Sequence, residues 1–180
     1  MKVVKPWVDE NYLTMLNKDS TCIFGTSHGG LAAFYIATRR PDLFGNCICM
    51  SASFWVGMDS NFRDPMKGFD HIREGALITE VASTLLALNV RPRIYIDWGL
   101  QRGGCLENQL TEAFVEKRSK EIADILRNEF LFTEFTVDGT PISEFMAVED
   151  HLGGHDFAAW RWRLHGALKW LLTGKNIPVV

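Results

Sequence analysis

One short stretch joins an apolar strand to a glycine-rich turn: Thr21-Cys22-Ile23-Phe24-Gly25-Thr26-Ser27-His28-Gly29-Gly30. Residues 21–24 have the apolar character of a buried strand, and residues 29–39 are predicted to form a helix. The G-x-S-x-G sequence between them predicts a tight turn that strains the backbone at Ser27 and lifts its hydroxyl clear of the sheet. We expect small residues two positions before and after Ser27, because side chains there would collide with the neighbouring strand and helix.

Outward from this turn, predicted strands and helices alternate along the chain, a pattern typical of a parallel sheet. Strands are predicted at 21–24, 46–50, 93–97, 132–137 and 143–148, and helices at 6–16, 29–39, 74–88, 107–130 and 157–172. The predicted fold class is therefore α/β, with a mostly parallel sheet, flanking helices and a single domain over residues 1–180.

Composition argues against several classes of protein. The 180 residues are 47% hydrophobic and 23% charged, and 19 basic against 22 acidic residues leave no surplus for binding nucleic acid. The longest apolar run, at 81–90, is too short to cross a membrane. No apolar leader marks export, which favours a cytoplasmic location. No His or Cys lies at ligand spacing around Cys105, so no metal is expected.

Ser27 needs a base to act as a nucleophile, because a serine hydroxyl is weakly nucleophilic alone. His155 follows a predicted strand and precedes the last helix, which is where the order serine, acid, histidine places the base. His151 in the same loop is the alternative. The backbone N–H of His28 is the expected first oxyanion donor, and the His28 side chain is expected to line the cleft together with Trp55 and Trp98.

Five segments together carry a family resemblance. Residues 5–12 are similar to K-P-x-[IV]-D-x-x-Y, 25–30 to G-x-S-x-G-G, 41–45 to P-[DE]-x-F-G, 51–55 to S-P-S-x-W and 153–160 to G-G-H-[DN]-x-x-x-W. In this order they resemble the esterase family of α/β-hydrolases that includes esterase D, enterochelin-esterase-like proteins and feruloyl or acetyl-xylan esterases. The resemblance covers most of the chain and supports Ser27 and His155 as its catalytic pair.

The resemblance implies an α/β-hydrolase fold and a serine carboxylic-ester hydrolase that works through an acyl-enzyme without a cofactor. It also implies a small-molecule or carbohydrate ester as substrate, with a small or aromatic acyl group. Transfer of the acyl group to a sugar or lipid would use the same Ser27 and His155. Hydrolysis and transfer are not distinguished by the sequence.

The acid of the triad departs from the family pattern. Asp97-Trp98-Gly99 matches the family's Asp-x-Gly, but Arg102 stands three residues beyond the glycine, where many members carry the acid. An arginine cannot stabilise an imidazolium ion, so we expect Asp97 to act, with Glu107 as the alternative. Asp97 could instead close its strand structurally, leaving a Ser-His dyad. Three carboxylates near the histidine are further candidates: Glu149, Asp150 and Asp156.

A second departure precedes Ser27. Only 26 residues lie before it, whereas the fold normally places several strands there, one of them followed by the loop that donates the second oxyanion N–H. We therefore expect an N-terminally truncated hydrolase domain whose 21–24 strand has an open edge. Such an edge is a template for pairing with a second copy. An inactive domain that acts by association is the competing hypothesis.

Overall fold

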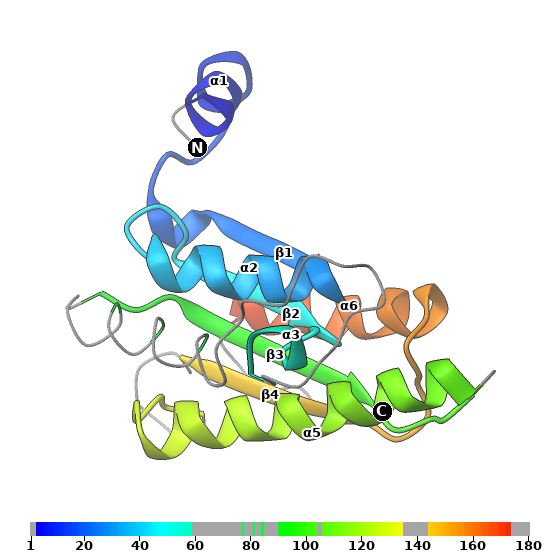
Figure 1. The fold of residues 1–180 in the computed structure, drawn as a ribbon. Helices are drawn as coiled ribbons and strands as arrows, with labels where there is room; N and C mark the ends of the chain where they lie inside the picture. Colours follow the sequence, from blue (N-terminus) through cyan, green and yellow to red (C-terminus); the bar gives the residue numbers. More distant parts are fainter. Residues whose placement is uncertain are drawn as a thin grey trace.

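The computed structural model describes residues 3–58, 77, 81, 84, 90–103, 106–134 and 144–173. Its centre is a four-stranded sheet in the order β1-β2-β3-β4, in which each neighbouring pair is parallel (Figure 1). The strands are β1 Cys22–Thr26, β2 Asn46–Met50, β3 Arg93–Gly99 and β4 Phe145–Asp150. The predicted α/β class with a parallel sheet is confirmed.

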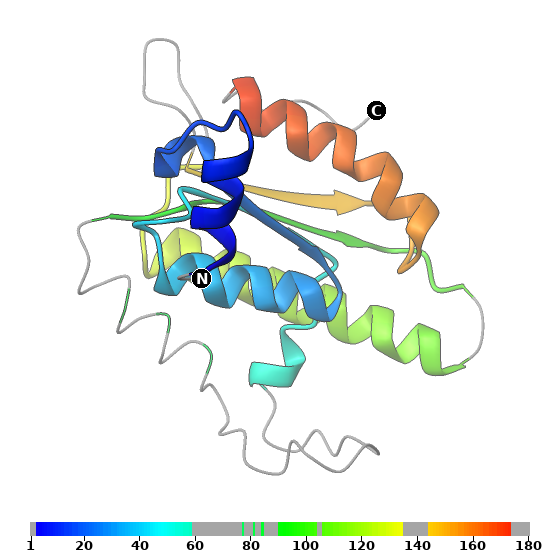
Figure 2. The same cartoon turned by 90° about the horizontal axis from the view of Figure 1, so that it is seen from above.

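Helices cover both faces of the sheet. Figure 2 shows α2 (His28–Arg39) and α5 (Leu106–Asn128) on one face and α6 (Phe157–Thr173) on the other. Because parallel strands need crossover connections, this layering places the carboxyl ends of all four strands at one edge. The shorter elements are α1 (Val4–Asn11), the 3₁₀ turn η1 (Lys18–Ser20) and α3 (Trp55–Met58).

Alternating side chains of β2 fill the two halves of the core. All five of its residues are buried. Cys47 and Cys49 belong to the cluster packed under α2 and α5, whereas Ile48 and Met50 belong to the cluster with Trp170 of α6. The two-residue period of a strand thus supplies both apolar layers. The loops at the strand ends are thereby held on a rigid base.

The predicted helix at 6–16 is too long at its C-terminal end. Tyr12 already has extended backbone, with φ −132° and ψ 153°, so α1 ends at Asn11. None of its residues is buried, and it stands apart from the sheet beyond β1 (Figure 1). Leu13 is fully exposed, so the apolar periodicity has no surface to pack against. Short helices in water depend on such packing.

Other predicted elements agree less completely with the structure. Residues 132–134 are not in a strand, and the remainder of the predicted 132–137 strand lies outside the described residues. Most of the predicted 74–88 helix also lies outside them. The predicted helices at 107–130 and 157–172 correspond to α5 and α6 within two residues at each end.

β1 lies at one edge of the sheet formed by the described residues. Phe24, in its middle, is 50% exposed, and Cys22 is exposed as well. The expectation of an open edge at this strand is therefore met within the described part of the chain. In the same ranges, no helix has the length and apolar character needed to cross a membrane.

Candidate active site

Ser27 forms the turn between β1 and α2 in an uncommon backbone conformation. Its φ is 54° and its ψ −122°, a region that costs a non-glycine residue about 1–3 kcal/mol and persists only when the surroundings enforce it. Two backbone hydrogen bonds supply that enforcement. The Ser27 N–H donates to the Met50 carbonyl at 2.9 Å, and the Ser53 N–H donates to the Ser27 carbonyl at 3.0 Å. The turn is thereby fixed to the carboxyl end of β2.

The glycines around Ser27 have different roles. A Cβ on Gly25 would lie 2.0 Å from the backbone oxygen of Gly29, which leaves no room for a side chain. A Cβ on Gly30 would lie 2.9 Å from that of Ala52, whereas one on Gly29 would meet nothing within 4 Å. The expected need for a small residue holds before Ser27. After Ser27, the residue that must be small is Gly30 and not Gly29, so the prediction for Gly29 is wrong.

His155 reaches Ser27 from the loop between β4 and α6. Its Nε2 lies 3.0 Å from the Ser27 Oγ, within hydrogen-bond distance. The ring packs edge-on against the indole of Trp160, with centroids 5.0 Å apart. Partial burial, the positive charge of Arg163 and that of His28 lower the pKa of His155 below the ordinary histidine value. The ring therefore stays neutral at lower pH values than an ordinary histidine does, and a general base must be neutral to accept a proton.

His28 and Ser53 lie on the other side of the Ser27 hydroxyl. The Ser53 Oγ is 3.3 Å from the Ser27 Oγ and 3.4 Å from the His28 Nδ1. The exposed His28 ring also faces Trp55, with centroids 6.2 Å apart. Ser53 was not predicted as a site residue. Its position in the 51–55 motif is the sequence feature that could have indicated it. His28 begins α2, so its amide is among those without an intrahelical acceptor.

The contacts of Asp97 are with Ser51 and Arg163 rather than with His155, so the geometry gives no support to its predicted role as the triad acid. Its side chain is fully buried, and its Oδ1 accepts from the Ser51 N–H at 3.0 Å and lies 3.3 Å from the Arg163 Nε. Burial raises the pKa of Asp97 to about 6, against the opposing effects of Arg163 and the Ser51 amide. The alternative reading, a structural carboxylate at the strand end, fits this placement.

Arg163 of α6 is the centre of a buried network next to the His155 loop, and no sequence pattern predicted this role. Its guanidinium contacts the Asp150 Oδ2 at 3.2 Å and donates to the Ser51 Oγ at 2.8 Å. The Trp160 Nε1 donates to the same hydroxyl at 3.1 Å. An arginine in an apolar helix is usually expected at the surface, yet Arg163 is only 1% exposed. The network ties Asp97 to the indole that supports the His155 ring.

The remaining predicted residues lie away from the Ser27 hydroxyl. Trp98 is 5% exposed and donates to Glu149 at 3.0 Å, which favours a structural role over the predicted pocket wall. His151 has a side chain that is 75% exposed and lies 3.8 Å from Glu149. Arg102 pairs with Glu116 of α5. The alternative acid Glu107 lies in the first turn of α5, but its side chain lies outside the described residues.

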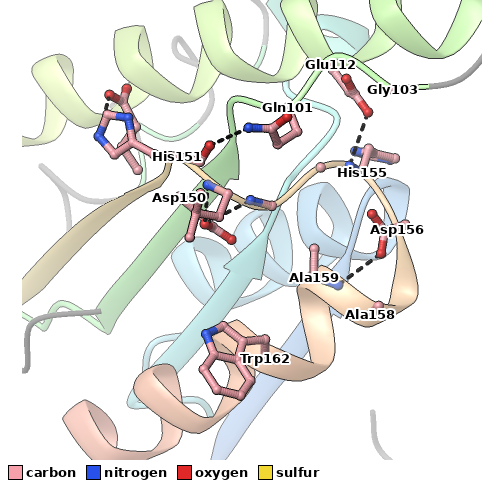
Figure 3. A pocket seen from close by; sticks show the side chains of 14 residues that line it. Gln101, Gly103, Glu112, Asp150, His151, His155, Asp156, Ala158, Ala159 and Trp162 are labelled. Carbon is pink, nitrogen blue, oxygen red and sulfur yellow. Dashed lines mark hydrogen bonds and ion pairs between the residues drawn. The ribbon is translucent and has the colours of Figure 1, made fainter. Parts of the chain in front are cut away.

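Glu112 of α5 reaches the His155 loop, a contact that the sequence did not suggest. Its Oε1 accepts the N–H of His155 at 3.3 Å, and the residue is only 6% exposed. It lines a cavity of about 710 Å³ between α5, the His155 loop and α6 (Figure 3). Asp156 and Trp162 line other parts of the same cavity. The carboxylate therefore contacts the backbone of the residue whose ring reaches Ser27.

Metal ligands do not gather at this site. Within the described ranges, no group of three or more His, Cys, Asp or Glu side chains could hold a metal ion. The chemical groups at hand are a hydroxyl, an imidazole, carboxylates and the amides at the N-terminus of α2. This set suits acyl transfer through a nucleophilic serine.

Comparisons with known proteins place these features in context. Residues 2–171 match the family model described as "Putative esterase". The chain is 28% identical over 158 residues to the iron(III) enterobactin esterase of Dickeya dadantii (strain 3937). That match covers 88% of this chain and 31% of the relative, so the chain spans about a third of the length of the curated relative.

Solved structures of serine hydrolases share the fold. The fluorophosphonate-binding serine hydrolase F of Staphylococcus aureus superposes with a TM-score of 0.66 at 16% identity, over 94% of this chain and 61% of that one. The S-formylglutathione hydrolase of the same organism gives 0.66 at 20% identity, over 94% and 58%. The enterochelin esterase of Shigella flexneri gives 0.63 at 22% identity, over 96% and 35%. At these identities the likeness establishes the α/β-hydrolase fold alone.

Proposed function

The chain belongs to the esterase family whose model it matches, and from this premise we propose that it is a serine carboxylic-ester hydrolase acting through an acyl-enzyme. The observation that carries the proposal is the 3.0 Å contact between the Ser27 Oγ and the His155 Nε2. The strained Ser27 turn supports it, because such strain concentrates at functional sites. Asp97 is not part of the proposal.

In the acylation step, the Ser27 Oγ attacks the carbonyl carbon of the ester while the His155 Nε2 accepts the hydroxyl proton. The carbonyl oxygen becomes an oxyanion next to the N-terminus of α2, where the His28 N–H donates to it. The intermediate then collapses as the bond to the alcohol oxygen breaks. His155 returns the proton to that oxygen, which releases the alcohol and leaves the acyl group on Ser27.

Deacylation repeats these steps with water as the nucleophile. His155 accepts a proton from the water as its oxygen attacks the acyl carbon, and the collapse returns the proton to the Ser27 Oγ and frees the carboxylic acid. An alcohol in place of water would give a new ester instead. The ratio of free acid to transesterified product, measured with an added alcohol, distinguishes hydrolysis from acyl transfer.

We propose a small-molecule or carbohydrate ester with a small or aromatic acyl group as the substrate. The exposed His28 ring supports this choice, since its Nδ1 lies 3.4 Å from the Ser53 Oγ next to Ser27 and the ring faces the buried indole of Trp55. The curated relative is named an enterobactin esterase, and one structural neighbour is a ferulic acid esterase. Stacking on such rings would favour an aromatic acyl group over a long aliphatic one.

The test compares p-nitrophenyl acetate hydrolysis by the purified chain and by the Ser27→Ala variant. Release of nitrophenolate by the wild type alone would support Ser27 as the nucleophile. Mass spectrometry after a rapid acid quench should then find the acetyl group on the peptide that contains Ser27. Equal rates in the two proteins would refute the proposal.

We also propose that the β1 edge pairs with a second copy of the chain. The support is the half-exposed Phe24 on that strand and the absence of buried residues in α1 beyond it. An unpaired strand edge offers backbone donors and acceptors to another strand. Light scattering should give a dimer mass that Phe24→Lys reduces to the monomer, and a monomeric wild type at high concentration would refute the pairing.

A further inference from the structure

We propose that Glu112 is the positioning carboxylate for His155, a role that rests on the ester hydrolysis proposed above. Glu112 would hold the imidazole with its Nε2 toward Ser27 and would stabilise the imidazolium ion that forms during acylation. Neither the family motif nor the order of residues along the sequence points to it. The assignment comes from the placement of two buried polar atoms.

One of these atoms belongs to each residue. When the His155 Nε2 accepts the Ser27 proton, the other ring nitrogen, Nδ1, carries a hydrogen that needs an acceptor. In the described structure, Nδ1 is buried without a hydrogen-bond partner, and so is the Oε2 of Glu112. Leaving such a buried atom unpaired costs about 1–3 kcal/mol. A donor and an acceptor are therefore both unsatisfied on residues that already touch.

The existing contact brings the carboxylate to the correct residue. The other oxygen of Glu112, Oε1, accepts the backbone N–H of His155 at 3.3 Å (Figure 3). A Cβ on Gly154 would lie 3.2 Å from this oxygen, so the glycine before His155 lets the carboxylate approach closely. Hydrogen bonds of catalytic groups are often long without substrate and shorten in the complex. A rotation of the Glu112 side chain is the motion required here.

The other carboxylates around the loop already have partners. Asp150 accepts from two backbone amides of its own loop and pairs with Arg163. Asp156 is exposed and accepts the N–H of Ala159 in the first turn of α6. Glu149 pairs with Lys120 at 2.7 Å and accepts from an indole. Glu112 is the buried carboxylate of this group with an oxygen left over.

The first test measures kinetics of the wild type, Glu112→Gln and Glu121→Gln. Glu121 lies on the same helix, pairs with Arg118 and has a side chain that is 44% exposed, so it controls for loss of a charge on α5. We expect Glu112→Gln to lower kcat about 10²- to 10⁴-fold, as loss of a triad carboxylate does elsewhere, with little change in KM. Glu121→Gln should match the wild type.

A second readout separates positioning of the ring from general support of the fold. The groups that face His155 are His28 of α2, Arg163 of α6 and Asp156 of its own loop, and Glu112 adds a negative charge from α5. Loss of that charge destabilises the imidazolium ion, so the acid limb of kcat/KM should move to lower pH in Glu112→Gln. Proton NMR should also show the His155 Nδ1–H moving upfield.

The outcomes distinguish this inference from the proposed function. If Ser27→Ala is inactive while Glu112→Gln keeps the wild-type rate, acid limb and Nδ1–H shift, Ser27 stands as the nucleophile and Glu112 is rejected. If the wild type is no faster than Ser27→Ala, the esterase proposal fails and the role of Glu112 fails with it. Thermal unfolding of Glu112→Gln checks its fold, and a folded, slow variant with a shifted limb supports the inference.

Discussion

The serine side and the histidine side of this site are built in different ways. Ser27 is held by residues close to it in sequence and by the end of the adjacent strand, through backbone hydrogen bonds and glycine contacts. His155 is held by side chains from three separate elements: Glu112 of α5, and Trp160 and Arg163 of α6 with their partner Ser51. A turn held by backbone contacts requires particular residues close together in the sequence, which form a recognisable motif. A network of side chains from distant elements has no such motif.

The largest expected effect is on the pair that joins the two sides. Ser27→Ala and His155→Gln should each lower kcat on the order of 10⁴-fold or more, because the hydroxyl and its base act as a unit. For the same reason the double variant should be about as slow as either single one. Steady-state rates with p-nitrophenyl acetate test this. Multiplicative losses would mean that the two residues act independently.

The difference between the two sides of the site explains what the sequence could and could not predict. The parallel sheet and most helices followed from periodicity, because buried strands and amphipathic helices differ in their repeat. The prediction that Ser27 and His155 form a pair came from glycine-containing motifs at strand ends, and the structure places the two side chains 3.0 Å apart. The end of α1 at Asn11 could not be predicted from periodicity, since it depends on whether the apolar residues that follow pack against the rest of the protein.

The acid is the part of the site that the sequence predicts least well. Asp97 stands at the expected strand end, but the fold places a buried arginine beside it, and that pairing arises from residues 66 positions apart. Glu112 contacts His155 across 43 positions. No sequence pattern predicts either contact, because a small rotation of the helix about its axis would bring a different side chain to the site. Contacts of this type require the three-dimensional arrangement of α5 and α6.

Two glycines test the turn held by backbone contacts on the serine side. Gly25→Ala places a Cβ 2.0 Å from the Gly29 oxygen, so the backbone must shift, and we expect destabilisation of about 1–3 kcal/mol or more together with loss of activity. Gly29→Ala meets nothing within 4 Å and lies in α2. It should be neutral or stabilising by up to about 1 kcal/mol. Urea unfolding measures both variants, and equal effects would contradict the distinction.

Asp97 tests the side-chain network on the histidine side. Its pKa rises from 3.8 to about 6 in the folded state, so the folded protein holds this proton more tightly than the unfolded chain. The contribution of Asp97 to the free energy of unfolding should therefore be greatest below pH 3.8 and decrease as the pH rises to about 6. At about 1.4 kcal/mol per unit, the full decrease is about 3 kcal/mol.

The matched variants are Asp97→Asn and Asp42→Asn. Urea unfolding between pH 4 and 7 should show the wild type losing stability relative to Asp97→Asn as the pH rises. The variant also loses the ion pair with Arg163, which lowers its free energy of unfolding by an amount that we expect not to vary with pH. Asp42 is the control with the opposite sign, because its contact with Arg40 lowers its pKa. A difference between wild type and Asp97→Asn that does not vary with pH would mean that Asp97 stays ionised throughout.

The smallest effect concerns the charges around His155, where the two sides of the site meet. Burial, then Arg163, then His28 lower the pKa of this histidine, while Asp156 raises it. The acid limb of kcat/KM should therefore lie below pH 6.5 in the wild type, because His155 must be neutral to accept a proton. His28→Gln removes a positive charge and should move the limb to higher pH. Asp156→Asn removes a negative charge and should move it to lower pH, so limbs that shift in the same direction would show that His155 is not the titrating base.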